Sequence, residues 1–208
     1  MRERRGSHGS GRPGEGQRLG DGSIPPGQAP DTQEGMTVFM IVNRPRILVL
    51  GLGDPARGDE GIGVYLARSL RDAFDGVEVR ESSTEPPPFF GIFHDFDLLI
   101  VIDSVRFCSV VGRVYVGTPT SLSGLKGAPT PQTEALDDAL TYARLTGARM
   151  PTIKVIGVCV PDEDTTDSDL TPAVADEYAA ILARVRAAVK EIIRDADASS
   201  RTFSIGHA

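Results

Sequence analysis

Cysteine, long hydrophobic runs and excess positive charge are all scarce in this sequence of 208 residues. Two cysteines, Cys108 and Cys159, suggest no disulfide framework, and we expect Cys159 to be a buried apolar residue. No apolar run approaches the roughly 20 residues of a membrane span. The N-terminal arginines are followed by glycine and serine, not by the apolar segment of a signal peptide. The net charge of −7 argues against nonspecific nucleic-acid binding. Together these absences favour a soluble, cytoplasmic protein.

The first 45 residues differ in composition from the rest of the chain. They are rich in glycine, proline, serine and arginine, with almost no apolar periodicity before Met36, so they cannot offset the entropy of ordering. We interpret residues 1–45 as a disordered extension, or as an upstream start codon with translation beginning at Met36 or Met40. One domain is expected over residues 46–194, followed by a flexible polar tail over 195–208.

Continuous apolar runs predict a sheet that is buried on both faces. The strands expected at 46–51 and 98–102 contain continuous rather than alternating apolar runs, which are typical of parallel strands covered by helices. Further strands are expected at 77–81 and 153–160. Only about ten residues separate the strand at 98–102 from the one at 113–116, too few for a helical crossover. We therefore expect 113–116 to be antiparallel and at or near an edge.

Apolar residues at helical spacing predict helices between these strands. The helices are expected at 60–74, shortly after Pro88, at 133–146 and at 172–194. Residues 118–130 should form a long loop, and 162–169 an acidic, solvated loop. The predicted fold is a three-layer α/β sandwich, with a mostly parallel five-stranded sheet, helices on both faces and one antiparallel strand.

A glycine turn followed by two acids ends the first strand. Gly51 and Gly53 suggest a dinucleotide fold, in which the backbone holds a pyrophosphate at a helix N-terminus. However, Asp59 and Glu60 stand where the phosphate would have to lie, and two carboxylates repel an anion and attract a cation. Acids in a first helical turn are also stabilised by the helix dipole alone, so a structural role stays open.

Another acid, Asp103, stands at the carboxyl end of the strand at 98–102. Ligands of open α/β sheets bind beyond the carboxyl ends of the strands, so Glu60 and Asp103 should converge there if their strands are neighbours. The alternative for Asp103 is a hydrogen bond to its own turn. His94 precedes the same strand. Since this strand is roughly 15 Å long, we expect His94 to lie at the end of the sheet opposite to Asp103.

From about residue 46 to about residue 193, the chain resembles the hydrogenase maturation proteases. These endopeptidases trim the C-terminus of the nickel–iron hydrogenase large subunit. The resemblance is carried by the glycine turn with residues 59–64, by Ile102-Asp103, by residues 132–147, by residues 155–158 and by Leu170-Thr171-Pro172. It implies that Glu60 and Asp103 are the catalytic, metal-contacting acids.

The third metal-contacting residue of the family is a histidine, and ungapped alignment places Gln132 at this position. Two smaller departures are Asp54, where an asparagine is usual, and residues 85–88, where a glycine-containing loop is expected. Imidazole suits nickel better than a neutral amide oxygen does. We therefore expect weak nickel binding by the chain alone, through Glu60, Asp103 and Gln132.

The resemblance implies an aspartic-type endopeptidase that removes the C-terminal extension of a hydrogenase large-subunit precursor after nickel insertion. The precursor is then the protein partner, and its nickel is the ion that is recognised. The alternative is a homologue that binds a metal or a protein without cleaving it, and a nucleotide-binding module is a third reading. No serine or cysteine nucleophile can be paired with a base in this sequence. A monomer is expected.

Overall fold

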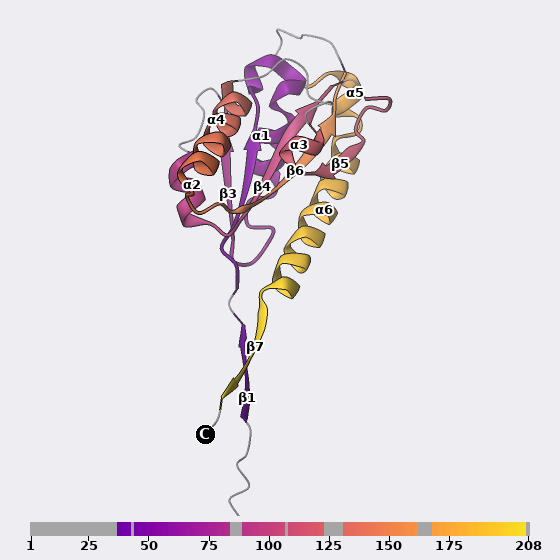
Figure 1. The fold of residues 1–208 in the computed structure, drawn as a ribbon. Coiled ribbons are helices and arrows are strands. Elements are labelled where there is room, and N and C mark those ends of the chain that lie inside the picture. Colours follow the sequence, from indigo (N-terminus) through magenta and orange to yellow (C-terminus); the bar gives the residue numbers. More distant parts are fainter. Residues whose placement is uncertain are drawn as a thin grey trace, which may run out of the picture.

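The computed structural model describes residues 37–42, 44–83, 89–106, 108–122, 131–161 and 168–206. A five-stranded sheet lies between two layers of helices (Figure 1). Its strands are β2 (Ile47–Leu52), β3 (Val77–Ser82), β4 (Leu98–Val105), β5 (Val114–Gly117) and β6 (Thr152–Cys159). Their spatial order is β3-β2-β4-β6-β5, in which only β5 is antiparallel to its neighbour.

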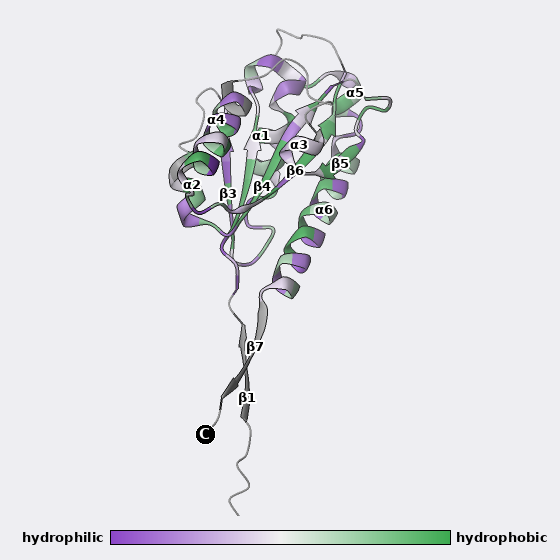
Figure 2. Ribbon diagram, viewed as in Figure 1, coloured by the Kyte–Doolittle hydropathy of each residue, from purple (hydrophilic) through white to green (hydrophobic). Residues whose placement is uncertain are grey.

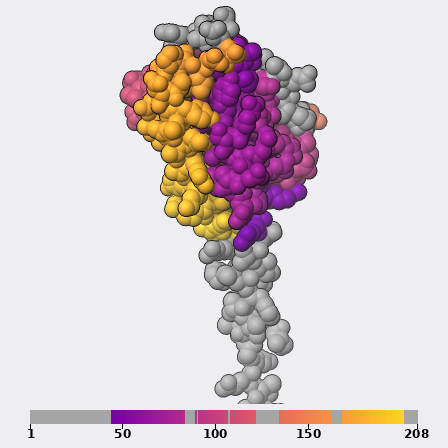
Figure 3. All heavy atoms as spheres, turned by 180° about the vertical axis from the view of Figure 1, so that it is seen from behind, coloured from indigo at the N-terminus to yellow at the C-terminus, as the bar shows by residue number. Residues whose placement is uncertain are grey.

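The helices cover the two faces of the sheet in pairs. On one face, α1 (Ile62–Ser69) and α6 (Tyr178–Ser199) pack on strand residues such as Val49 and Ile100. Figure 3, which is turned by 180° from the view of Figure 1, shows this face of the molecule. On the other face, α2 (Phe89–Asp95) and α4 (Pro131–Thr146) pack on alternate strand residues such as Leu50 and Val101.

Because successive strand residues point to opposite faces, both clusters draw on the same apolar strands. Apolar and polar residues alternate along α6 (Figure 2), as expected for a helix with one buried face. The predicted fold class is confirmed.

The antiparallel edge strand is also confirmed. β5 pairs only with β6, with Val114 opposite Val158 and Gly117 opposite Val155. The connection from β4 to β5 is short because β5 starts at the end of the sheet where β4 finishes and runs in the opposite direction. Val116 is 51% exposed on this strand.

Two predicted helices differ from the observed ones. The first was expected at 60–74, but a 3-10 helix, η1 (Pro55–Gly61), precedes α1, and α1 ends at Ser69. Asp72 adopts a left-handed conformation with φ of 63°, which is incompatible with a continuing helix. The last helix was expected at 172–194, but the chain forms α5 (Pro172–Ala175) and then α6. α6 continues to Ser199 because Ala196 extends its apolar stripe by one turn.

The two chain ends contain strands that composition did not predict. β1 (Thr37–Val42) pairs antiparallel with β7 (Arg201–Gly206) in a separate two-stranded sheet (Figure 1). The expected disordered extension over 1–45 and flexible tail over 195–208 stay predictions. Residues 1–36 lie outside the described part of the chain.

The long loop predicted over 118–130 begins with a short helix, α3 (Pro119–Leu122). Residues 123–130 lie outside the described ranges, as do residues 84–88 and residues 162–167 of the predicted acidic loop. Within the part of the chain that the structure describes, no helix is long and apolar enough to cross a membrane.

Candidate functional site

The glycines of the first turn bring helices into direct contact with the sheet. A Cβ on Gly63 would lie 2.3 Å from the Leu52 carbonyl oxygen and 2.4 Å from that of Ile102. A Cβ on Gly53, whose φ is 134°, would lie 1.9 Å from the carbonyl oxygen of Glu60. Main-chain packing therefore requires these glycines, and it places Glu60 beside the carboxyl end of β2.

Asp59 has a structural role in this arrangement. Its side chain is buried and accepts two hydrogen bonds from Thr171, at 2.8 Å from the backbone nitrogen and 2.7 Å from Oγ1. Thr171 is the residue that precedes α5. The first acid of the pair thus fastens η1 to the start of α5, which leaves the second, Glu60, as the candidate for chemistry.

Asp54 also has a structural role, at the beginning of η1. Its Oδ1 accepts a hydrogen bond from the Ala56 N–H at 2.9 Å, which is N-cap geometry. An asparagine side-chain oxygen can make the same bond. The departure from the family's usual asparagine therefore preserves the local structure.

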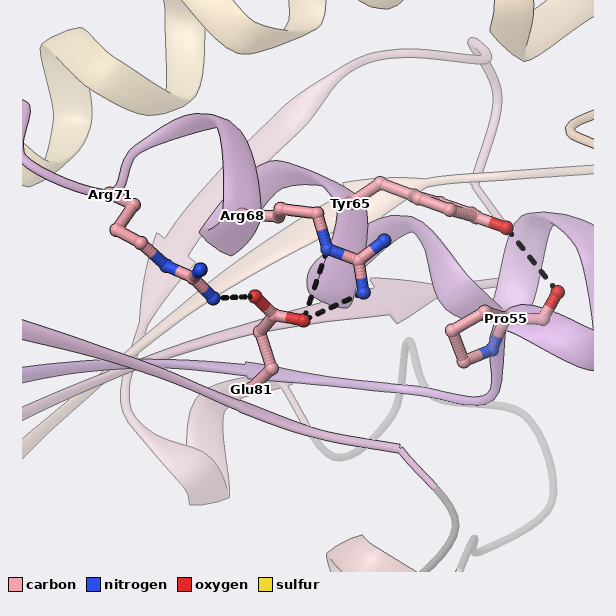
Figure 4. Close-up of polar contacts among 5 residues, drawn as sticks. All are labelled: Pro55, Tyr65, Arg68, Arg71 and Glu81. Atoms are coloured by element: carbon pink, nitrogen blue, oxygen red, sulfur yellow. Dashed lines mark hydrogen bonds and ion pairs between the residues drawn. The ribbon is translucent and has the colours of Figure 1, made fainter.

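Polar contacts between α1 and its surroundings fix the helix that follows the site (Figure 4). Glu81 of β3 accepts hydrogen bonds from Arg68 at 2.8 and 3.2 Å and forms an ion pair with Arg71. The hydrogen bond to Glu81 raises the pKa of the Arg68 guanidinium. The Tyr65 hydroxyl donates to the carbonyl oxygen of Ser168 at 3.0 Å, and it lies 3.4 Å from the carbonyl oxygen of Pro55.

Glu60 is clamped between two arginines. Its Oε1 lies 2.7 Å from Nη2 of Arg106, and its Oε2 lies 2.9 Å from Nη1 of Arg57. The side chains of Glu60 and Arg106 are only 14% and 15% exposed, whereas that of Arg57 is 51% exposed. Sequence reasoning missed both arginines. Arg106 lies 46 residues from Glu60, and nothing local links the two. Arg57 lies only three residues before Glu60, and this i,i+3 spacing is a local signal that could have found it.

Asp103 lies in β4, at the same edge of the sheet. β2 and β4 are parallel neighbours, as the prediction required, and the side chain of Asp103 is buried. Its Oδ1 accepts the N–H of Ser104 at 2.9 Å, so the hydrogen bond of the structural alternative is present. The ion pair between Glu60 and Arg106 also joins η1 to the residue directly after β4.

Gln132 and His94 lie on different helices, α4 and α2. Gln132 is the second residue of α4, and its side chain lies outside the described part of the structure, so its role stays a prediction. His94 is exposed in the last turn of α2, and its carbonyl accepts a hydrogen bond from Arg46 Nη2 at 3.1 Å. Arg46 directly precedes β2, so His94 lies at the amino end of the sheet, as expected.

A disulfide joins Cys108 to Cys159, which corrects the expectation that Cys159 is an unpaired apolar residue. β4 extends to Val105, which pairs directly with Cys159 of β6. The chain then folds back, and the two cysteine Cα atoms lie 6.0 Å apart, within the range that a disulfide spans. A sequence separation of 51 residues gives no local signal for this pairing.

Comparison with known proteins shows what the sequence and the fold of this chain are similar to. No family model matches the chain. The hydrogenase 2 maturation protease of Escherichia coli (strain K12) is 29% identical over 151 residues, which cover 70% of this chain and 92% of that protein. The E. coli hydrogenase maturating endopeptidase HybD superposes with a TM-score of 0.58 at 27% identity, covering 77% of this chain and 97% of that structure. The chain is a homologue of the hydrogenase maturation proteases.

A more distant neighbour supports the fold of this homologue. The [NiFe] hydrogenase maturation protease HybD from Thermococcus kodakarensis has a TM-score of 0.55 at 20% identity, covering 71% of this chain and 99% of that structure. At this identity the likeness concerns the fold alone. The resemblance inferred from sequence motifs is thus confirmed by both sequence and structure.

The donor set of this homologue does not fit a resident divalent ion. Among the described residues, no three histidine, cysteine, aspartate or glutamate side chains gather as a metal site. Both carboxylate oxygens of Glu60 are occupied by guanidinium groups, and one oxygen of Asp103 accepts a backbone N–H. A divalent ion would therefore have to bind Glu60 beside two guanidinium cations or displace one of them.

Proposed function

We propose that this chain is the endopeptidase that removes the C-terminal extension of a nickel–iron hydrogenase large-subunit precursor after nickel insertion. Its similarity to the E. coli hydrogenase 2 maturation protease, over 92% of that protein, carries the proposal. The position of Glu60 and Asp103 at one edge of the sheet supports it, since ligands of such sheets bind there.

The chemistry is of the aspartic type, with carboxylates rather than a serine or cysteine nucleophile. Glu60 and Asp103 contact the nickel that the precursor carries, and Gln132 supports this contact through its amide oxygen. The nickel enters as part of the substrate, so the free protein needs no resident ion. Nickel prefers nitrogen ligands to amide oxygen, which is consistent with weak binding by the protein alone.

The competing readings have less support. No finding favours a homologue that binds without cleaving, since the curated and structural relatives are named as maturation proteases. For a nucleotide-binding module, the glycine turn would have to cradle a phosphate, whereas main-chain contacts already explain Gly53 and Gly63. We further propose that the enzyme acts as a monomer in the cytoplasm.

The test is cleavage of a nickel-loaded hydrogenase large-subunit precursor that carries its C-terminal extension. Wild-type protein should shorten the precursor, which mass spectrometry of the intact subunit detects. Glu60→Gln and Asp103→Asn should each slow cleavage by about 100-fold or more, since each removes a charged contact to the reacting region.

The matched control is Glu78→Gln, which removes an exposed carboxylate paired with Arg80 on β3. It should cleave at the wild-type rate. Wild-type protein that leaves the nickel-loaded precursor intact would refute the proposed function. Full activity in both site variants would instead show that the site is elsewhere.

A further inference from the structure

We propose that Arg106 is a selectivity residue, which keeps Glu60 closed to free divalent ions and leaves it available to nickel presented by the precursor. This inference rests on the proposed function, because it concerns the same carboxylate. It adds a residue that neither the motif nor the resemblance indicates. The geometry of the two arginines on Glu60 carries it.

Arg106 competes directly for the oxygen that a metal ion would use. The distance of 2.7 Å between its Nη2 and Glu60 Oε1 is that of a charge-assisted hydrogen bond. Both side chains are about six-sevenths buried, so water and salt screen this pair weakly. Arg57 occupies the other oxygen, but its guanidinium is half exposed, so its effect on an approaching ion is more strongly screened.

The backbone around Arg106 is anchored on two sides. Before it, the Val105 carbonyl accepts the N–H of Val160 at 3.0 Å. After it, Cys108 is linked covalently to Cys159, whose backbone also bonds to Gly112 and Arg113 at 2.8 Å each. The guanidinium therefore reaches Glu60 from the residue that directly follows β4, whose last residue is hydrogen-bonded to Val160.

A free hydrated nickel ion is disfavoured at this carboxylate for two reasons. If it binds beside Arg106, it is repelled by the guanidinium charge in a poorly screened site. If it displaces Arg106, the hydrogen bond between Arg106 and Glu60 is lost. A precursor that carries nickel has a further source of binding energy, because its protein surface also contacts the enzyme. That remote binding energy can offset displacement of the arginine, whereas a free ion has none.

The experiment is calorimetric titration of the purified, full-length protein with nickel chloride. Arg106→Gln should bind nickel at least tenfold more tightly than wild type, which corresponds to about 1.4 kcal/mol. The double variant Glu60→Gln/Arg106→Gln should lose this gain, because the gain requires the carboxylate. The matched control is Arg68→Gln, which removes an arginine paired with Glu81 (Figure 4) and should leave nickel affinity unchanged.

Three results would overturn the inference: equal affinity in Arg106→Gln and wild type, persistence of the gain without Glu60, or the same gain in Arg68→Gln. If thermal denaturation shows that Arg106→Gln does not fold, the Arg57→Gln variant is titrated instead. Its nickel affinity should rise above that of wild type by a smaller factor, and an unchanged affinity would refute the inference. Cleavage of nickel-loaded precursor by wild type is measured separately. Failure of cleavage would refute the proposed function, while an unchanged nickel affinity with normal cleavage would refute only the role of Arg106.

Discussion

Breaking the disulfide between Cys108 and Cys159 should cost the protein a large part of its stability. In the chain-entropy treatment, the benefit of a cross-link grows with the logarithm of the loop that it closes. With a separation of 51 residues, this gives about 4 kcal/mol at 25 °C. In a domain of this size, 1 kcal/mol shifts the melting temperature by roughly 2–4 °C, so we expect a decrease of about 8–16 °C.

The assay is thermal denaturation followed by circular dichroism, with and without dithiothreitol. A titration of free thiols on the same samples establishes whether the bond is formed or reduced. The double variant Cys108→Ala/Cys159→Ala should melt close to the reduced wild type and should not respond to dithiothreitol. This variant separates loss of the cross-link from other effects of the reductant.

Two outcomes would refute the reasoning. Two titratable thiols in protein prepared without reductant would show that the bond does not form in solution. A melting temperature that stays constant while both thiols become free would show that the cross-link adds nothing to the noncovalent contacts of Cys159. Those contacts include its pairing with β4 and its backbone bonds to Gly112 and Arg113.

The remaining predictions concern Asp59 and Gln132. Asp59→Asn should lower the melting temperature by several degrees, because a buried carboxylate that accepts two hydrogen bonds from Thr171 becomes an amide, at a cost of about 1–3 kcal/mol. The control is Asp176→Asn, at an exposed position. An equally small decrease in melting temperature in both variants would show that Asp59 does not fasten η1 to α5. Gln132→His should tighten nickel binding in calorimetry, because imidazole replaces an amide oxygen. If affinity stays the same in both the wild-type and Arg106→Gln backgrounds, residue 132 is not a ligand.

The sheet was predictable because its signals are local. The strands expected at 46–51 and 98–102 correspond to β2 and β4, whose alternate residues supply two separate cores. The short connection before β5 was sufficient to predict an antiparallel edge strand. The motif around Glu60 and Asp103 likewise placed both acids at the same edge, because their strands are neighbours.

What the sequence could not provide depends on contacts between distant residues. Arg106 meets Glu60 across 46 residues, and Asp59 meets Thr171 across 112. Neither contact follows from periodicity or composition, since each forms only after the sheet has aligned the segments. The end of α1 was missed for another reason: apolar spacing continues to Phe74, while the left-handed backbone at Asp72 stops the helix.

The disulfide also has a topological consequence. It turns the chain between Cys108 and Cys159 into a closed covalent ring that contains β5, α3, α4 and all of β6. Gln132 lies on this ring, whereas Glu60 and Asp103 lie on the linear chain before it. A single backbone cut inside the ring would therefore open it without releasing any part of the molecule, and the helix that bears Gln132 would stay covalently attached to the strand that bears Asp103.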